Sequence, residues 1–277
     1  MISTREVTYE VDGLNMIAHL AQPDSPGPWP AVLLGHDGVG LEEYQRQRAD
    51  DLAAHGYLTL AMDYHGGEVF FDRPDAMLAR VMPLLGSVER MQAIGHAALD
   101  VLLAQPGADP ARIAALGYGA GGQIVLELAR SGVPFKAMAV IHPAFPDTTA
   151  DDWTDATGAF LLCTGSEDPL CTPQQLLTFG SILQRAGVDW RANIMAEPST
   201  PSGRNPETRM DRWPRVTPTP LPLCPASATT QNTLRAHGRP CSICSVRHSR
   251  QPGRLRWVGR VAFSSDAQLS QRLHLKS

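Results

Sequence analysis

The chain has no long hydrophobic run and no hydrophobic segment at its amino terminus. No stretch of its 277 residues approaches the roughly 18 consecutive apolar residues that a membrane-spanning helix needs. The first residues, Met1-Ile-Ser-Thr-Arg-Glu, lack the apolar core of a secretory signal. We therefore expect a cytoplasmic protein with no membrane partner, in which the five cysteines are thiols rather than a disulfide framework.

Acidic residues are nearly absent from the last part of the chain. Residues 1–197 contain 25 Asp and Glu against 11 Lys and Arg, whereas residues 198–277 contain 3 against 13. A basic tail can bind nucleic acid. However, residues 198–277 are also rich in Pro, Arg, Ser and Thr and show no sustained periodicity. We predict a folded domain over residues 1–197 and a disordered tail over 198–277, with no nucleic-acid partner.

Apolar runs that alternate with amphipathic stretches predict the fold class. A turn at Asp12-Gly13 makes a hairpin of the first two strands. The other strands alternate with helices, which predicts an α/β protein with a mostly parallel sheet and helices on both faces. Strands are expected at residues 7–11, 14–20, 31–34, 57–62, 113–116, 137–141, 159–164 and 190–194, and helices at 42–55, 74–84, 87–103, 124–128 and 173–184.

Three loops with polar or glycine-rich sequences follow predicted parallel strands. They span residues 35–40, 117–122 and 165–169. Ligands on a parallel sheet bind at the carboxyl ends of its strands, so these loops are expected to converge on one site.

The glycine-rich loop has the pattern of a nucleophile elbow, a tight turn between a strand and a helix. The nucleophile position is Gly119, which has no side chain. Gly117-x-Gly119-x-x-Gly122 also fits a dinucleotide fingerprint, but no carboxylate ends the next strand, which continues as His142-Pro143. We therefore expect no cofactor. A tight crossing without a function of its own is the remaining alternative.

The loop from Gly35 to Gly40 lies where an α/β-hydrolase places part of its oxyanion hole. Backbone N–H groups there can stabilise a developing oxyanion. His36 and Asp37 could orient substrate or tune a nucleophile, although Asp37-Gly38 could also be only a turn.

Asp168 follows an apolar strand in Ser-Glu-Asp-Pro, where a carboxylate could hold a catalytic histidine in the correct tautomer. A helix N-cap is the alternative. Cys163 lies within an apolar strand and is expected in the core. His65 and His142 lie near strand ends, but neither follows the acid in the chain, so both are expected to be structural.

Over residues 5–194 the chain resembles the dienelactone hydrolase family of α/β-hydrolases. The resemblance is carried by Gly35-His-Asp-Gly-Val-Gly-Leu41, Ala53-Ala-His-Gly-Tyr57, Ala61-Met-Asp-Tyr64, Gly117-Tyr-Gly-Ala-Gly-Gly122 and Thr164-Gly-Ser-Glu-Asp-Pro169. It implies a hydrolase of small carboxylic esters or lactones that needs no cofactor or metal. The site residues that it implies are the acid Asp168, the loop acid Asp37, the nucleophile position Gly119, and an oxyanion and substrate site formed by Gly35, His36, Gly38 and Ala120.

The chain departs from the family pattern twice. The family elbow is Gly-x-Cys-x-Gly-Gly, whereas this chain has Gly119 at the nucleophile position. The family histidine lies in Gly-Gly-Ala-x-His-Ala-Phe after the last strand, but here that strand continues as Met195-Ala-Glu-Pro-Ser-Thr-Pro-Ser202. Codons for these eight residues permit His-Gly-Gly-Ala-Glu-His-Ala-Phe in a shifted frame. We hypothesise a frameshift near residue 195, and interpret Cys241-Ser-Ile-Cys244 as a chance pattern rather than a zinc site.

These departures leave two hypotheses. The first is a dienelactone hydrolase-like ester or lactone hydrolase with a degenerate catalytic site. The second is a non-catalytic protein that retains the site for binding a small molecule. Under both hypotheses, the family's last helix, which would follow residue 195, is expected to be missing from the fold.

Overall fold

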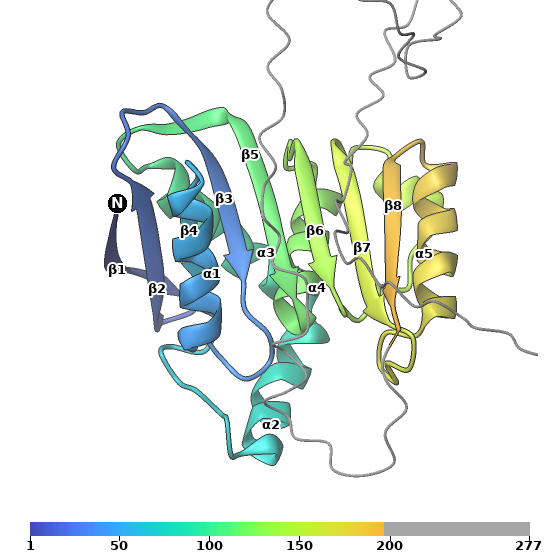
Figure 1. Ribbon diagram of the computed structural model, residues 1–277. Coiled ribbons are helices and arrows are strands. Elements are labelled where there is room, and N and C mark those ends of the chain that lie inside the picture. Colours follow the sequence, from blue (N-terminus) through green and yellow to red (C-terminus); the bar gives the residue numbers. More distant parts are fainter. Residues whose placement is uncertain (197–277) are drawn as a thin grey trace, which may run out of the picture. The chain divides into compact units, whose positions relative to one another are not determined.

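The computed structural model describes residues 1–196, and the predicted tail, the frameshift and the Cys241–Cys244 pattern lie almost wholly outside this range. The described residues form one eight-stranded sheet with flanking helices (Figure 1). In chain order the elements are β1 (Ile2–Val11), β2 (Leu14–Pro23), β3 (Trp29–Gly35), α1 (Glu43–Ala54), β4 (Leu58–Met62), α2 (Pro74–Leu85), α3 (Val88–Leu103), β5 (Ala108–Tyr118), α4 (Gly119–Arg130), β6 (Ala137–Ile141), the 3-10 helix η1 (Ala150–Trp153), β7 (Ala159–Gly165), α5 (Pro173–Arg185) and β8 (Asp189–Met195).

The strand order is β1-β2-β4-β3-β5-β6-β7-β8. Neighbouring strands pair antiparallel from β1 through β2 to β4, and parallel from β4 to β8. This mostly parallel sheet with an antiparallel edge confirms the predicted α/β-hydrolase fold class. The predicted hairpin is also confirmed, because Asp12 and Gly13 have φ angles of 53° and 74°, which suit a two-residue hairpin turn.

Helices cover both faces of the central strands, which explains why those strands are almost entirely apolar. In Figure 1, α1 lies in front of the sheet, and α3 and α4 lie behind it. Ten consecutive residues of α4, from Ala120 to Ala129, are buried, because this helix lies between the sheet and α3. On the α1 side, the sheet residues Ala114, Ala139 and Leu161 remain only partly buried.

The last strand is fixed to α5 by an aromatic ring. A Cβ atom added to Gly180 would lie 2.4 Å from the Trp190 ring, so the indole of β8 lies directly against the α5 backbone. Phe179, on the same helix, stacks on Phe145 with ring centroids 4.7 Å apart and meets Trp153 edge-on at 5.1 Å. These contacts join β8 and α5 to the main core.

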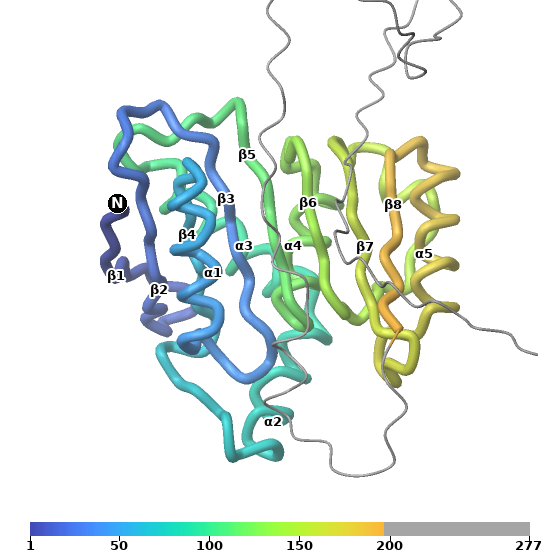
Figure 2. The backbone as a smooth tube through the Cα atoms, in the orientation of Figure 1, coloured from blue at the N-terminus to red at the C-terminus, as the bar shows by residue number. Residues whose placement is uncertain are grey.

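The carboxyl ends of β3, β5, β6 and β7 lie along one edge of the sheet, the lower edge in Figure 2. The loop of residues 36–42, the first turn of α4 and the loop of residues 166–172 begin at that edge. The predicted convergence of three loops is therefore confirmed.

Candidate active site at the carboxyl edge of the sheet

The elbow between β5 and α4 depends on glycines for close backbone contact. A Cβ atom at Gly117 would lie 2.5 Å from the Gly122 Cα, and one at Gly121 would lie 2.2 Å from the His36 carbonyl oxygen. The Gly121 N–H instead donates a 2.9 Å hydrogen bond to that oxygen. These distances explain why residues 117 and 121 are glycines, and the hydrogen bond holds the first turn of α4 against the loop after β3.

Gly119 occupies the nucleophile position at the turn, with a φ angle of 48°. A Cβ atom there would make only ordinary contacts, the nearest at 3.5 Å from the Asp37 Cβ and 3.5 Å from the His142 Cε1. The His142 Nδ1 would be 3.6 Å away. Within the described residues the turn therefore has room for a Cβ atom, and the space lies beside the Asp37 side chain and the His142 imidazole.

Asp37 is 5% exposed and follows β3. Its Oδ1 accepts a 2.8 Å hydrogen bond from the Val39 N–H, which forms the turn that the sequence suggested. Its Oδ2 is buried and has no hydrogen-bond partner within residues 1–196. Burial, followed by the nearby charge of Asp37, raises the pKa of Glu42 above its ordinary value. The site is therefore acidic on this side.

His36 lies beneath the loop rather than at its surface. Its side chain is fully buried and stacks on Tyr64 with ring centroids 3.7 Å apart. Its Nδ1 donates a 2.5 Å hydrogen bond to the Asp37 carbonyl oxygen, which can only accept. This placement favours a role in shaping the loop over contact with a substrate.

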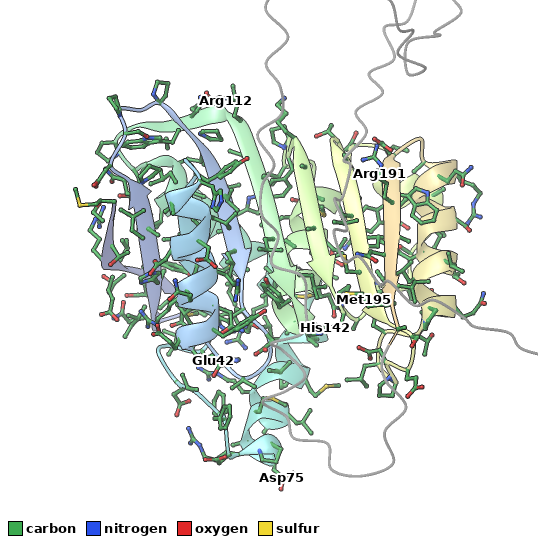
Figure 3. The ribbon with its side chains drawn as sticks, viewed as in Figure 1. Glu42, Asp75, Arg112, His142, Arg191 and Met195 are labelled. Atoms are coloured by element: carbon green, nitrogen blue, oxygen red, sulfur yellow. The ribbon has the colours of Figure 1, made fainter. Side chains whose placement is uncertain are left out.

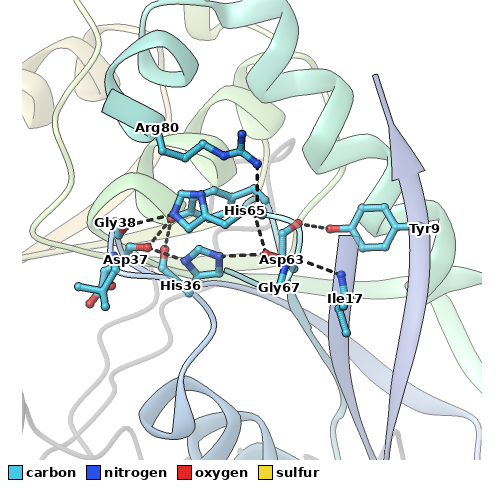
Figure 4. A network of polar contacts seen from close by, with 11 residues as sticks. Tyr9, Ile17, His36, Asp37, Gly38, Asp63, His65, Gly67 and Arg80 are labelled. Carbon is cyan, nitrogen blue, oxygen red and sulfur yellow. Dashed lines mark hydrogen bonds and ion pairs between the residues drawn. The ribbon is translucent and has the colours of Figure 1, made fainter. Parts of the chain in front are cut away.

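Close packing and hydrogen bonds also place Gly35, Gly38 and Ala120. A Cβ atom at Gly35 would lie 2.9 Å from the Gly121 Cα, so this glycine permits the close crossing of β3 and α4. The Gly38 carbonyl oxygen accepts a 3.0 Å hydrogen bond from His65 Nε2 (Figure 4). Ala120 is 7% exposed in the first turn of α4, where backbone N–H groups lack partners within the helix.

Asp63, which was not expected from the sequence to be functional, anchors this region from the side of Tyr9 and Ile17 (Figure 4). Its carboxylate accepts hydrogen bonds of 2.8, 2.8 and 2.7 Å from the N–H groups of Ile17, His65 and Gly67. The His36 Nε2 lies 3.8 Å away, which is an ion-pair distance rather than a hydrogen bond. Burial alone would raise the pKa of Asp63, but the His36 imidazole and the backbone N–H groups outweigh it and lower the pKa to about 2.

His65 is structural, as its sequence position suggested. It is 1% exposed, and burial followed by the charge of His36 lowers its pKa to about 4. Because Nε2 donates to a carbonyl, Nδ1 carries the lone pair, and this atom has no hydrogen-bond partner in the described residues. A proton added at Nδ1 would therefore be buried without an acceptor.

Asp168 lies in the loop after β7 and is 6% exposed. Its Oδ1 accepts hydrogen bonds of 2.9 Å from the Leu170 N–H and 3.0 Å from the Cys171 N–H, which fix the direction of the carboxylate. The N-cap of α5 is Thr172, so Asp168 does not cap that helix. The helix N-cap alternative is thus wrong, and Asp168 is held by its own loop after β7.

The two cysteines near this loop are unsuited to act as nucleophiles. Cys163 and Cys171 are 7% and 0% exposed. Burial raises the pKa of the Cys163 thiol to about 12 and that of Cys171 to about 11, so both remain protonated near neutral pH. The expected core position of Cys163 is confirmed.

His142 is the site residue that the sequence argument set aside. It directly follows β6 at the carboxyl edge of the sheet (Figure 3). Its φ angle is 42°, and its N–H donates a 2.8 Å hydrogen bond to the Cys163 carbonyl oxygen. Since β6 pairs with β5, the end of β6 lies next to the elbow, and this adjacency brings the imidazole to Gly119.

Two structural features concern membranes and metal ions. No helix among residues 1–196 has both the length and the apolar character needed to cross a bilayer. No group of three or more His, Cys, Asp or Glu side chains in the same range is arranged to hold a metal ion.

Comparisons with known proteins agree with this architecture. The model of the dienelactone hydrolase family matches residues 16–215. The solved structure of m3DLH is 32% identical, with a TM-score of 0.65 over 70% of this chain and 81% of its own. A dienelactone hydrolase-like promiscuous phosphotriesterase from metagenomic libraries is 29% identical, with a TM-score of 0.66 over 71% of this chain and 82% of its own.

A third structure is more distant. A cold-adapted esterase from an Arctic intertidal metagenomic library is 21% identical, with a TM-score of 0.55 over 72% of this chain and 88% of its own, and shares the fold. No match was found among curated proteins. Since the family model covers most of the chain and m3DLH is 32% identical over 70% of it, the chain belongs to the dienelactone hydrolase family.

Proposed function

We propose that the carboxyl edge of the sheet takes a small carboxylic ester or lactone, and that this chain cannot form an acyl-enzyme there. The observation that carries the proposal is Gly119. It occupies the nucleophile position of an otherwise intact elbow, with space for a side chain that it lacks. Family membership supports the substrate class.

The remaining groups keep the roles that the family pattern gives them. The Ala120 N–H and the backbone of the loop from Gly35 to Gly40 are suited to hold an oxyanion, because helix N-termini and preorganised N–H groups stabilise developing negative charge. Asp168 would orient a histidine, and the segment where the family carries that histidine follows β8, outside the described residues. Asp37 would polarise whatever occupies the nucleophile position.

The alternative is a site that binds the same class of molecule without turnover. The missing side chain at Gly119 also favours this function. Product formation that is abolished by Asp168→Ala would support a hydrolase, whereas saturable binding without product would support a binder.

The covalent route is tested by restoring and blocking the side chain at residue 119 in the full chain. Gly119→Cys supplies the family nucleophile, and Gly119→Ala is the matched control that adds a Cβ without a thiol. The left-handed backbone makes either change cost about 1–2 kcal/mol, so folding is verified by circular dichroism. Each protein is incubated with p-nitrophenyl acetate, and acetylated peptides are identified by mass spectrometry.

We expect an acetyl group on residue 119 only in Gly119→Cys. Acetylation of the unmodified chain at a side chain of the site would contradict the loss of the covalent route. A folded Gly119→Cys protein that neither binds nor reacts with the ester would contradict the proposed substrate class.

A further inference from the structure

Two side chains outside the family's acid–histidine pair flank the empty nucleophile position. Asp37 reaches it from the loop after β3, and His142 reaches it from the end of β6. Both lie at ordinary contact distance from the point where a Cβ at Gly119 would be: 3.5 Å for Asp37 Cβ, 3.5 Å for His142 Cε1 and 3.6 Å for His142 Nδ1. The space left by the missing side chain thus lies between the Asp37 Cβ and the His142 imidazole.

Asp37 has an acceptor that no described group uses. Its Oδ2 is buried in a residue only 5% exposed and lacks a hydrogen-bond partner in residues 1–196. Burying such an acceptor without a donor is unfavourable. A water molecule within reach of this oxygen would supply the donor.

His142 holds a left-handed backbone conformation, with a φ angle of 42°. A non-glycine residue in this region is uncommon, and such backbone strain concentrates at functional sites. The conformation is maintained by the 2.8 Å hydrogen bond from its N–H to the Cys163 carbonyl oxygen on β7. The backbone therefore holds the imidazole beside the elbow.

We propose that His142 and Asp37 activate a water molecule in the space left by Gly119, and that this water attacks the carbonyl of the ester or lactone directly. This inference rests on the proposed substrate class. In the first step the water oxygen bonds to the acyl carbon as one of its protons passes to the His142 imidazole, and the carbonyl oxygen becomes an oxyanion.

In the second step the oxyanion re-forms the carbonyl and the acyl C–O bond breaks. The leaving alkoxide takes the proton from the imidazolium, so the products are a carboxylic acid and an alcohol, or one hydroxy acid from a lactone. No electrons are transferred to or from the protein. The Asp37 carboxylate accepts a hydrogen bond from the water and stabilises the imidazolium by its negative charge.

This mechanism gives Gly119 a positive role. A methyl group at residue 119 would occupy the space assigned to the water, although it would meet no atom of residues 1–196 closer than 3.5 Å. Gly119→Ala is therefore expected to fold and to lose turnover. A merely degenerate elbow predicts no effect of the same substitution.

The test uses the full chain with p-nitrophenyl acetate and the lactone dihydrocoumarin. His142→Asn removes the imidazole while keeping a residue type that tolerates the left-handed conformation. Asp37→Asn removes the charge. His55→Asn is the control, since His55 is an exposed histidine whose Nδ1 bonds only the Asp51 carbonyl oxygen of α1. Binding of dihydrocoumarin is measured separately by saturation-transfer NMR.

We expect His142→Asn to lower kcat by about 100-fold or more with little change in KM, because general acid–base catalysis typically contributes 10²–10⁴-fold. The histidine limb of the kcat/KM pH profile should disappear with it. Asp37→Asn and Gly119→Ala should also lower kcat, whereas His55→Asn should not. Gly119→Ala keeps the test valid if His142→Asn does not fold.

The outcomes separate the two proposals. If dihydrocoumarin does not bind and neither compound is hydrolysed, the proposed substrate class is wrong. If dihydrocoumarin binds but the unmodified chain does not turn over, the water mechanism is overturned and the binding function stands. Turnover that survives His142→Asn and Gly119→Ala would overturn it as well.

Discussion

Acidification from pH 6.5 towards pH 4 is expected to destabilise the protein through protonation of His65. The folded state lowers the pKa of His65 from 6.5 to about 4, first by burial and then by the charge of His36. Between pH 6.5 and pH 4, His65 therefore binds a proton more readily in the unfolded chain than in the folded chain. The stability that depends on a neutral His65 is fully present above pH 6.5 and is lost as the pH falls towards 4.

The size of this loss follows from the pKa difference. The full shift corresponds to about 3 kcal/mol, and about 2 kcal/mol of it should be lost by pH 5. Asp63 does not contribute in this window. Its pKa is lowered from 3.8 to about 2, so the stability that it supplies is present above 3.8 and lost only at more acidic pH.

The assay is urea denaturation at several pH values between 8 and 5, which gives the free energy of unfolding at each. His65→Gln retains an N–H donor for the Gly38 carbonyl oxygen but does not titrate, so it should lose about 2 kcal/mol less than the unmodified chain between pH 8 and pH 5. His55→Gln, at an exposed histidine, is the matched control and should behave like the unmodified chain. An unmodified chain that is equally stable at pH 8 and pH 5, or an equal loss in His65→Gln, would refute the reasoning.

Three further predictions concern packing, thiol chemistry and the gene. Gly121→Ala should prevent stable folding, because its Cβ would lie 2.2 Å from a main-chain oxygen, whereas Gly86→Ala, with a nearest contact of 3.4 Å, should leave the melting temperature almost unchanged. Cys163 and Cys171 should resist a thiol reagent at pH 8 until the protein is unfolded, as peptide mass spectrometry can show; rapid labelling would contradict their burial. DNA sequencing across codons 190–205 should find a frame that encodes Gly-Gly-Ala-Glu-His-Ala-Phe, and a gene that cannot encode this segment would refute the frameshift hypothesis.

Most of the fold could be predicted from local sequence, because the central strands are short apolar runs between clear turn and helix signals. β5 shows the limit of this approach. The sequence predicts residues 113–116, whereas the strand spans Ala108–Tyr118. The polar segment is included because Trp29 and Pro30 pair with Ala108 and Asp109 before the register shifts. That pairing depends on a distant strand and leaves no signal in the segment itself.

Site residues that belong to one continuous motif could be predicted from the sequence. Residues that are brought together from different strands were harder to predict. The elbow glycines and Asp168 follow from their own neighbours in sequence. His142 was set aside because it precedes the acid in the chain, but spatial order in a sheet differs from chain order. Asp63 could not be recognised as an anchor, because its partner Ile17 lies on β2, 46 residues earlier.

The contact between Trp190 and Gly180 has a consequence for how this chain can change over time. It anchors β8 by an indole lying against the backbone of α5, and both residues precede Met195, after which the chain departs from the family's histidine segment. The contact that joins β8 to α5 is thus made by residues that precede this segment. A change confined to the later segment would leave the contact intact, so the strand–helix packing and the histidine can change separately.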